Sequence, residues 1–209
     1  MSNETPALVA RAIATAREQG FPLTREAAGT GLPSASLPAT GRFLAVLAAS
    51  CGDGRIAELG TGVGIGSAWL ASAMPADCML ITTEIDPARA AAAAAVLAAD
   101  ERVQVRTGDW ADLLPPLAPF DLIFADSGIR DQATFGALVS MLRPGGRIVM
   151  DDVTPVAALP LDSPLRDNDP KRALFTGETR LLWTEVVLPD LRNSLLVGAR
   201  PERQRPSPE

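Results

Sequence analysis

Between residues 55 and 150, short apolar runs alternate with longer segments whose apolar positions recur at helical spacing. The short runs predict buried strands, because parallel strands covered on both faces are apolar at nearly every position. The helix beginning at Pro87 has a clear start signal, since Asp86 can cap its free amides and proline suits the first helical position. We expect strands at 55–59, 79–84, 103–106, 120–125 and 147–150, and helices at 66–73, 87–99 and 132–142.

Strands that alternate with helices predict right-handed β–α–β units, and hence a parallel sheet with helices on both faces. Two further helices, at 6–19 and 41–49, are expected before this core. After it come a polar stretch at 160–172 and two β-rich runs at 180–188 and 194–199, with a hairpin-like turn at 189–193. The pattern therefore predicts a doubly wound α/β fold whose sheet gains an antiparallel pair at its end.

The bulk composition fits one ordinary globular domain: 209 residues, of which 47% are hydrophobic and 21% charged. We expect an N-terminal helical segment at 1–35, the main domain at 36–199, and a disordered tail at 200–209 that has three prolines and no apolar anchor. The net charge of −6 disfavours nucleic acid and anionic membranes as partners.

No apolar run reaches the roughly 20 residues of a membrane helix, and Arg11 interrupts the first apolar run, so no signal peptide is expected. Cys51 and Cys78 are expected to be buried thiols in a reducing compartment, which favours a cytoplasmic location. The chain has no histidine, and Lys171 is its only lysine. Any mechanism that needs a histidine base or a histidine metal ligand is therefore excluded.

A glycine-rich segment, ELGTGVGIGS at 58–67, follows the first predicted strand and opens a helix. A dinucleotide fingerprint needs G-x-G-x-x-G/A, and every register fails, because the third position is Ile65, Ser67 or Trp69. A carboxylate at Glu58 would repel a pyrophosphate but suits the cationic amino group of S-adenosylmethionine (SAM). The other interpretation is a tight turn with a solvated glutamate. The residues assigned to SAM here are Glu58, Gly60, Thr61, Gly62, Gly64, Gly66 and Ser67.

Two more acidic positions follow the next predicted strands. Glu84, with Ile85 beside it, ends the second strand, where a carboxylate can accept hydrogen bonds from ribose hydroxyls. Asp109 and Trp110, after Gly108, follow the third strand, where an adenine ring would lie. The alternative for this pair is a capping aspartate and a core tryptophan.

With these motifs, residues 36–199 resemble the class I SAM-dependent methyltransferases, and more narrowly the O-methyltransferases related to catechol and caffeoyl-CoA O-methyltransferase. The resemblance implies a Rossmann-like, seven-stranded, mostly parallel sheet with a C-terminal antiparallel hairpin, and it places Ser36 near SAM. The motifs that carry it are ELGTGVG at 58–64, EIDP at 84–87, FDLIFAD at 120–126 and LRPGGRIVMDDV at 142–153.

The resemblance also implies a divalent cation held by Asp126, Asp151 and Asp152, although Asn is usual at the third position. Oxygen ligands select a hard ion such as Mg²⁺, Mn²⁺ or Ca²⁺. The alternative is that Asp126, which we also count among the cofactor residues, touches cofactor or substrate while the other two cap the loop.

The family's loop after the fourth strand usually carries a lysine base, and here Arg130 falls nearest to it. A guanidinium stays protonated and is a poor base. The catalytic candidates are therefore Asp126, Arg130 and Asp131, with Lys171 as a further base candidate in a segment where a lid could form. Metal activation or alignment alone are the other routes.

We expect SAM-dependent methyl transfer to a hydroxyl of a small, catechol- or phenol-like molecule. The alternatives are methylation of nitrogen or of a protein, a module that binds SAM without catalysis, and, more remotely, a nicotinamide oxidoreductase. An apolar stripe of Leu8, Val9 and Ile13 predicts that the N-terminal segment covers the substrate mouth or forms a homodimer contact.

Overall fold

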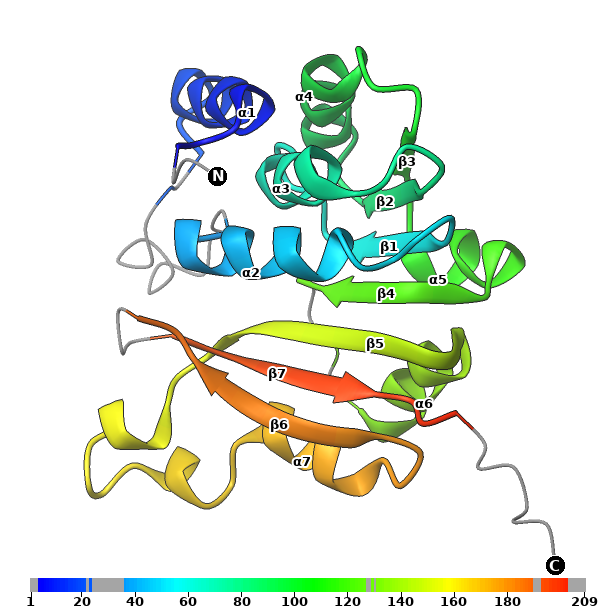
Figure 1. The fold of residues 1–209 in the computed structure, drawn as a ribbon. Helices are drawn as coiled ribbons and strands as arrows, with labels where there is room; N and C mark the ends of the chain where they lie inside the picture. Colours follow the sequence, from blue (N-terminus) through cyan, green and yellow to red (C-terminus); the bar gives the residue numbers. More distant parts are fainter. Residues whose placement is uncertain are drawn as a thin grey trace, which may run out of the picture.

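The computed structural model describes residues 4–21, 23, 36–126, 129, 131–189 and 193–202. Its centre is a seven-stranded sheet with the order β3-β2-β1-β4-β5-β7-β6, in which only β7 runs antiparallel to its neighbours (Figure 1). The predicted Rossmann-like sheet with a C-terminal antiparallel pair is confirmed. The strands are β1 Arg55–Leu59, β2 Met79–Glu84, β3 Val103–Thr107, β4 Phe120–Ala125, β5 Leu142–Val153, β6 Leu182–Val187 and β7 Ser194–Ala199.

Helices cover both faces of the sheet, and α1 forms an outer layer against α3 and α4 (Figure 1). One face packs against α2 and α3, with α4 beside them over β2 and β3, and the other packs against α6 and α7. The helices are α1 Ala7–Glu18, α2 Pro38–Ala48, α3 Ile65–Ala73, α4 Pro87–Leu97, α5 Trp110–Leu113, α6 Gln132–Ser140 and α7 Pro170–Gly177; short 3₁₀ turns are η2 Pro115–Leu117, η3 Val156–Ala158 and η4 Pro164–Arg166.

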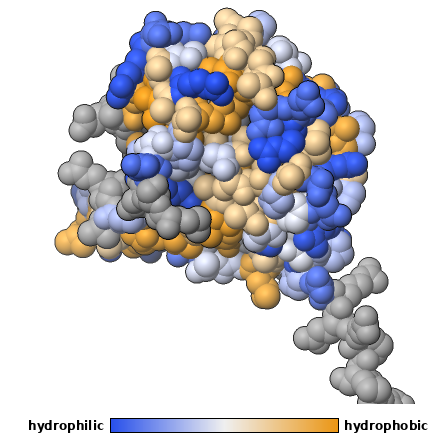
Figure 2. Space-filling model, turned by 45° about the horizontal axis from the view of Figure 1, so that its top comes forward, coloured by the Kyte–Doolittle hydropathy of each residue, from blue (hydrophilic) through white to orange (hydrophobic). Residues whose placement is uncertain are grey.

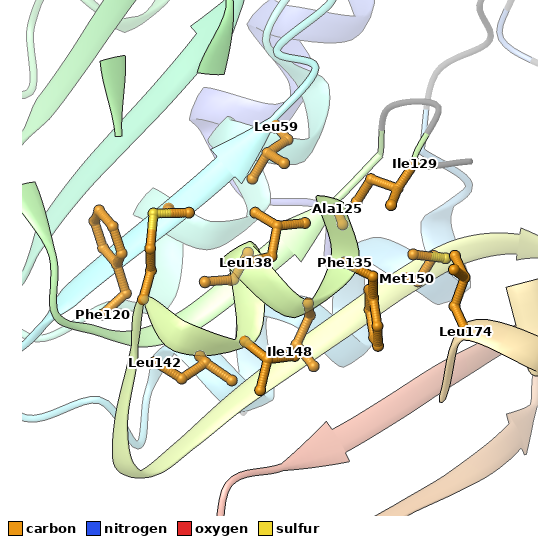
Figure 3. Close-up of a cluster of buried hydrophobic side chains, with 14 of the residues drawn as sticks. Leu59, Phe120, Ala125, Ile129, Phe135, Leu138, Leu142, Ile148, Met150 and Leu174 are labelled. Carbon is orange, nitrogen blue, oxygen red and sulfur yellow. The ribbon is translucent and has the colours of Figure 1, made fainter. Parts of the chain in front are cut away.

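The largest core cluster lies between the sheet and α6. Figure 3 shows Leu59 and Ala125 from neighbouring strands facing Phe135 and Leu138 of this helix. Phe135 also meets Phe175 of α7, with ring centroids 4.8 Å apart. Full burial of one such aromatic or aliphatic side chain stabilises a fold by roughly 1.5–3 kcal/mol. The packing of α6 and α7 on the same face thus anchors the C-terminal half of the chain.

Three elements begin several residues from where the sequence predicts or were not predicted at all. Helix α7 begins at the end of the expected polar stretch: Asp169 caps it by accepting from the backbone N–H of Arg172 at 2.9 Å, and its own Leu174 is buried. Strand β5 begins at Leu142 rather than 147, because it pairs with β4 on both sides of a register shift. Helix α2 begins at Pro38, where proline's fixed φ suits the first turn.

The apolar stripe of α1 packs inside the chain. Val9 is fully buried, and Leu8 and Ile13 pack against the same cluster, formed with α3 and α4. The stripe therefore gives no support to the predicted dimer contact, because the chain itself covers it. Of the predicted N-terminal segment, residues 1–3, 22 and 24–35 lie outside the described residues, as do 203–209 of the predicted tail.

Cys51 and Cys78 are both buried and unpaired, as expected. In the part of the chain that the structure describes, no helix is long and apolar enough to span a membrane. The face shown in Figure 2 carries hydrophilic and hydrophobic patches side by side.

A matched pair of glycine substitutions tests the turn before α3. Gly64 and Gly52 both have left-handed backbone, with φ of +91° and +61°. A Cβ on Gly64 would lie 3.3 Å from the Cβ of Ala93 in α4, whereas nothing lies within 4 Å of one on Gly52. Gly52→Ala should cost about 1–2 kcal/mol of unfolding free energy, the penalty for a left-handed alanine. Gly64→Ala should cost more, because its Cβ would also press against Ala93 of α4. Equal losses of unfolding free energy in urea titrations would contradict this close packing of Gly64 on α4.

Candidate functional site

The carboxyl ends of four parallel strands bring the candidate loops to one edge of the sheet. Leu59, the last residue of β1, is in register with Thr83 of β2 and Ala125 of β4. Glu84 of β2 is in register with Thr107 of β3. The loops that begin after these residues therefore start side by side, at the edge where open α/β sheets bind ligands.

A cavity of about 450 Å³ opens at this edge. All of the predicted cofactor residues line it except Gly64, which faces α4, and Ser67, which is buried beneath it. Phe21, Val63, Ile65, Thr83 and Arg89 also line the cavity and were not predicted. The predicted residues on its wall are Ser36, Glu58, Gly60, Thr61, Gly62, Gly66, Glu84, Ile85, Gly108, Asp109, Trp110 and Asp126.

Glu58 is a buried carboxyl under the glycine loop, with 1% of its surface exposed. It accepts hydrogen bonds from the hydroxyls of Ser67 and Thr82, the latter at 2.7 Å. Burial raises the pKa of Glu58 to about 7, against the lowering effect of these two hydrogen bonds. A carboxyl in this state favours a cation in the cavity, because a positive neighbour would stabilise its charged form.

Glu84 holds the glycine loop in place from the neighbouring strand. Its Oε2 accepts from the backbone N–H of Gly62 at 2.8 Å, and its Oε1 accepts from that of Asp86 at 3.0 Å. Arg89 forms an ion pair with it at 3.1 Å. Glu84 thus lines the cavity and also fixes the shape of the loop opposite.

The two aspartates after β2 and β3 both cap helices. Asp86 accepts from the backbone N–H groups of Ala88 and Arg89, as predicted. Asp109 accepts from the N–H of Ala111 at 2.9 Å and also lines the cavity beside Trp110. Asp109 therefore both caps α5 and lines the cavity.

An acidic cluster of Asp126, Asp151 and Asp152 adjoins the cavity through Asp126. Burial raises the pKa of Asp126 well above its usual range, and the charges of Asp151 and Asp152 add to the rise while Lys171 opposes it. Asp151 has 4% of its surface exposed. Its Oδ1 accepts from Nδ2 of Asn193 and from the backbone N–H of Asp152, both at 2.7 Å.

The predicted metal site is not confirmed by the arrangement of these carboxylates. Asp151 is engaged by its two donors, and Asp152 is exposed, with a left-handed φ of +60°. Among the described residues, no three acidic or thiol side chains converge in a way that could hold a metal ion. The sequence placed the three carboxylates at the right edge of the sheet, and there Asn193 holds the carboxylate of Asp151 by a hydrogen bond.

The remaining catalytic candidates lie away from the cavity wall or cannot be placed. Asp131 caps α6 by accepting from the backbone N–H and the hydroxyl of Thr134, each at 2.8 Å. These bonds lower the pKa of Asp131 and make it a poor base, so its catalytic prediction is not supported. Arg130 lies outside the described residues. Lys171 reaches the acidic cluster, which its sequence position alone does not show.

Comparisons with known proteins agree with this fold and cavity. A family model described as a methyltransferase domain matches residues 57–153. The chain is 39% identical over 140 residues to a catechol O-methyltransferase of Niastella koreensis, covering 62% of this chain and 63% of the relative. For the first curated relatives, the match spans 63%, 56% and 61% of their own lengths.

Solved structures extend the likeness to nearly the whole chain. The O-methyltransferase TomG from Streptomyces achromogenes, solved in complex with SAM, is 27% identical with a TM-score of 0.72, covering 95% of this chain and 91% of that one. Cofactor-bound Rv0187 from MTB is 25% identical with a TM-score of 0.75, covering 95% and 92%. The fold and cavity are those of a nucleoside-binding α/β protein. The chain is thus similar to class I SAM-dependent methyltransferases, and the relatives and the SAM-bound structure that it matches are named O-methyltransferases.

The raised pKa of Glu58 predicts how stability depends on pH. The folded chain holds a proton on Glu58 up to about pH 7, whereas the unfolded chain releases it near the ordinary value of 4.5. This stabilisation is complete below the unfolded pKa and is lost as pH rises through about 7. Urea titrations of the ligand-free protein should show that Glu58→Gln, which mimics the protonated carboxyl, reduces the loss of stability over this range. Identical pH profiles for both proteins would refute the assignment.

Proposed function

We propose that this protein transfers the methyl group of SAM to a hydroxyl of a small, catechol- or phenol-like molecule. The observation that carries the proposal is the cavity at the sheet edge, which joins the glycine loop, Glu58, Glu84 and Asp109 in one wall. SAM supplies an electrophilic methyl group on a sulfonium. The relative from Niastella koreensis, named a catechol O-methyltransferase, supports the acceptor class.

The wall residues suit the three parts of SAM. Glu58 and the N–H groups of the glycine loop would bind the amino-acid end, because a buried carboxyl gains its charge beside an ammonium. Glu84 would accept from the ribose hydroxyls, and Asp109 from the adenine amino group, with Trp110 flanking the ring. Asp126, on the same wall, then marks the acceptor end.

The chain's contribution to the reaction would be positioning more than acid–base chemistry. It has no histidine, and the described Asp131 is engaged as a helix cap. Holding an acceptor oxygen in line with the methyl group, in a cavity shielded from water, can supply a large share of the rate. The proposed reaction includes no step on a metal ion, because no three acidic or thiol side chains in the described part of the chain form a metal site.

Replacing Glu84 should weaken SAM binding. Hydrogen bonds to a charged group contribute about 1.5–3 kcal/mol, so Glu84→Ala should raise the Kd for SAM by roughly 10- to 150-fold in calorimetry. The loss of its bond to the N–H of Gly62 acts in the same direction. Glu101→Ala removes an exposed carboxylate elsewhere and serves as the control. Unchanged affinity in the Glu84 variant would refute the ribose assignment.

A turnover screen tests the activity itself. Catechols, phenols, aliphatic alcohols and amines would each be incubated with SAM and the protein, and S-adenosylhomocysteine would be measured. We expect product with catechols or phenols and none with amines. SAM binding without turnover on any acceptor would favour a non-catalytic SAM-binding module, and turnover on amines alone would favour the nitrogen alternative.

A further inference from the structure

Two hydroxyl groups hold the buried carboxyl of Glu58 beneath the glycine loop. Thr82 of β2 is in register with Glu58 of β1, and Ser67 belongs to α3, the helix that the loop opens. The side chains of Ser67 and Thr82 are fully buried, and neither lines the cavity. Both hydroxyls donate to the same atom, Oε2 of Glu58, that of Thr82 at 2.7 Å.

A third hydroxyl fixes the direction of these hydrogen bonds. The Oγ1 atoms of Thr61 and Thr82 lie 2.5 Å apart. A hydroxyl has one hydrogen, and when Glu58 is charged Thr82 gives its hydrogen to that carboxylate, so Thr61 donates to Thr82. Thr61 itself lines the cavity. A chain of oriented hydroxyls therefore runs from the cavity wall to Oε2.

The other oxygen of this carboxyl, Oε1, lies on the side of the cavity. It is the atom that a Cβ on Gly66 would strike first, with the hydroxyl of Ser36 next, and Gly66, Ser36 and Glu58 all line the cavity. Within the described part of the chain, the hydrogen bonds of the carboxyl go to Oε2 and none goes to Oε1.

This one-sided arrangement points to a ligand with positive charge. A buried carboxyl that only stabilised the fold would be expected to have donors on both oxygens, because each can accept. Glu84 and Asp126 lie on the same cavity wall, so an anion would be repelled from it. An ammonium is both a donor and a cation, and it suits Oε1 on both grounds.

We propose that the hydroxyls of Thr82 and Ser67 position Glu58 for the ammonium of the cofactor. By holding Oε2 they leave Oε1 as the acceptor for the α-amino group of SAM or of its product, S-adenosylhomocysteine (SAH). Thr82 and Ser67 are thus positioning residues, which act on the ligand only through Glu58. This inference rests on the SAM binding of the proposed function, and it names the residues that make the cavity selective for a nucleoside with an amino-acid end.

Binding of three ligands tests the inference without any turnover. SAH, its analogue that lacks only the amino group, and 5′-methylthioadenosine, which lacks the whole amino-acid end, all carry a neutral sulfur. Calorimetry at about pH 8, where Glu58 with its pKa of about 7 is charged, would give the three Kd values. The wild type should prefer SAH to the amino-free analogue by at least about 10-fold, the scale of a hydrogen bond to a charged group.

Removing the hydroxyl of Thr82 should reduce this preference. In Thr82→Val it should fall to about 3-fold or less, while the Kd for 5′-methylthioadenosine changes by less than about 2-fold. Thr82→Ser keeps the hydroxyl and should keep the preference, and Ser67→Ala should reduce it as Thr82→Val does. Thr184→Val removes an exposed hydroxyl from β6, at the far end of the sheet, and is the control that should change none of the three Kd values.

Two results would overturn the inference alone. One is the full wild-type preference for SAH in both Thr82→Val and Ser67→Ala. The other is an equal loss of affinity for all three ligands, which would make the hydroxyls merely structural. A wild type that binds SAH and the amino-free analogue equally would overturn the inference together with the assignment of Glu58 in the proposed function. If Thr82→Val does not fold, as judged by circular dichroism, Ser67→Ala decides between these outcomes.

Discussion

The register of β1 with its two neighbours determines where every group of the cavity lies. β1 is hydrogen-bonded to β2 on one side and β4 on the other, and four of its five residues are buried. Because both pairings are parallel, the three strands end together, and the chain must leave each of them at the same edge. The backbone N–H groups of Gly60 and Thr61 bond the carbonyl of Thr83, and that of Asp126 bonds the carbonyl of Leu59. A slip of one residue in β1 would therefore separate Glu58 from Ser67 and Thr82.

Features set by local sequence could be predicted. The central strands carry continuous apolar runs, the glycine loop follows the first of them, and the Asp-Pro pair at 86–87 starts α4 where expected. The same Asp-Pro pair occurs at 169–170 and starts α7. This helix was not predicted because it is apolar on one side only and polar residues surround its start. Phe21 and Arg89 reach the cavity from a loop and from a helix face, and neither has a motif that would single it out.

The acidic cluster shows what sequence could not supply. The predicted order of the strands placed Asp126 and Asp151 at one edge of the sheet, and the register of β4 with β5 agrees. What each carboxylate does there depends on partners from distant segments. Asn193, 42 residues after Asp151, donates to that carboxylate, and Lys171 donates to the backbone carbonyls of Asp151 and Asp152. Neither contact follows from spacing, because each depends on how the antiparallel pair and α7 fold back onto β5.

The distribution of charge around the cavity has a consequence for the proposed reaction. Glu58, Glu84 and Asp126 line one wall, while Arg89 is paired with Glu84. Such a wall favours a ligand that carries positive charge, and SAM has both a sulfonium and an ammonium. When the methyl group leaves, the sulfonium becomes a neutral thioether and one of these two charges is lost. The same carboxylates that favour SAM binding would then hold the product less tightly, so the electrostatics of the cavity would favour turnover over product retention.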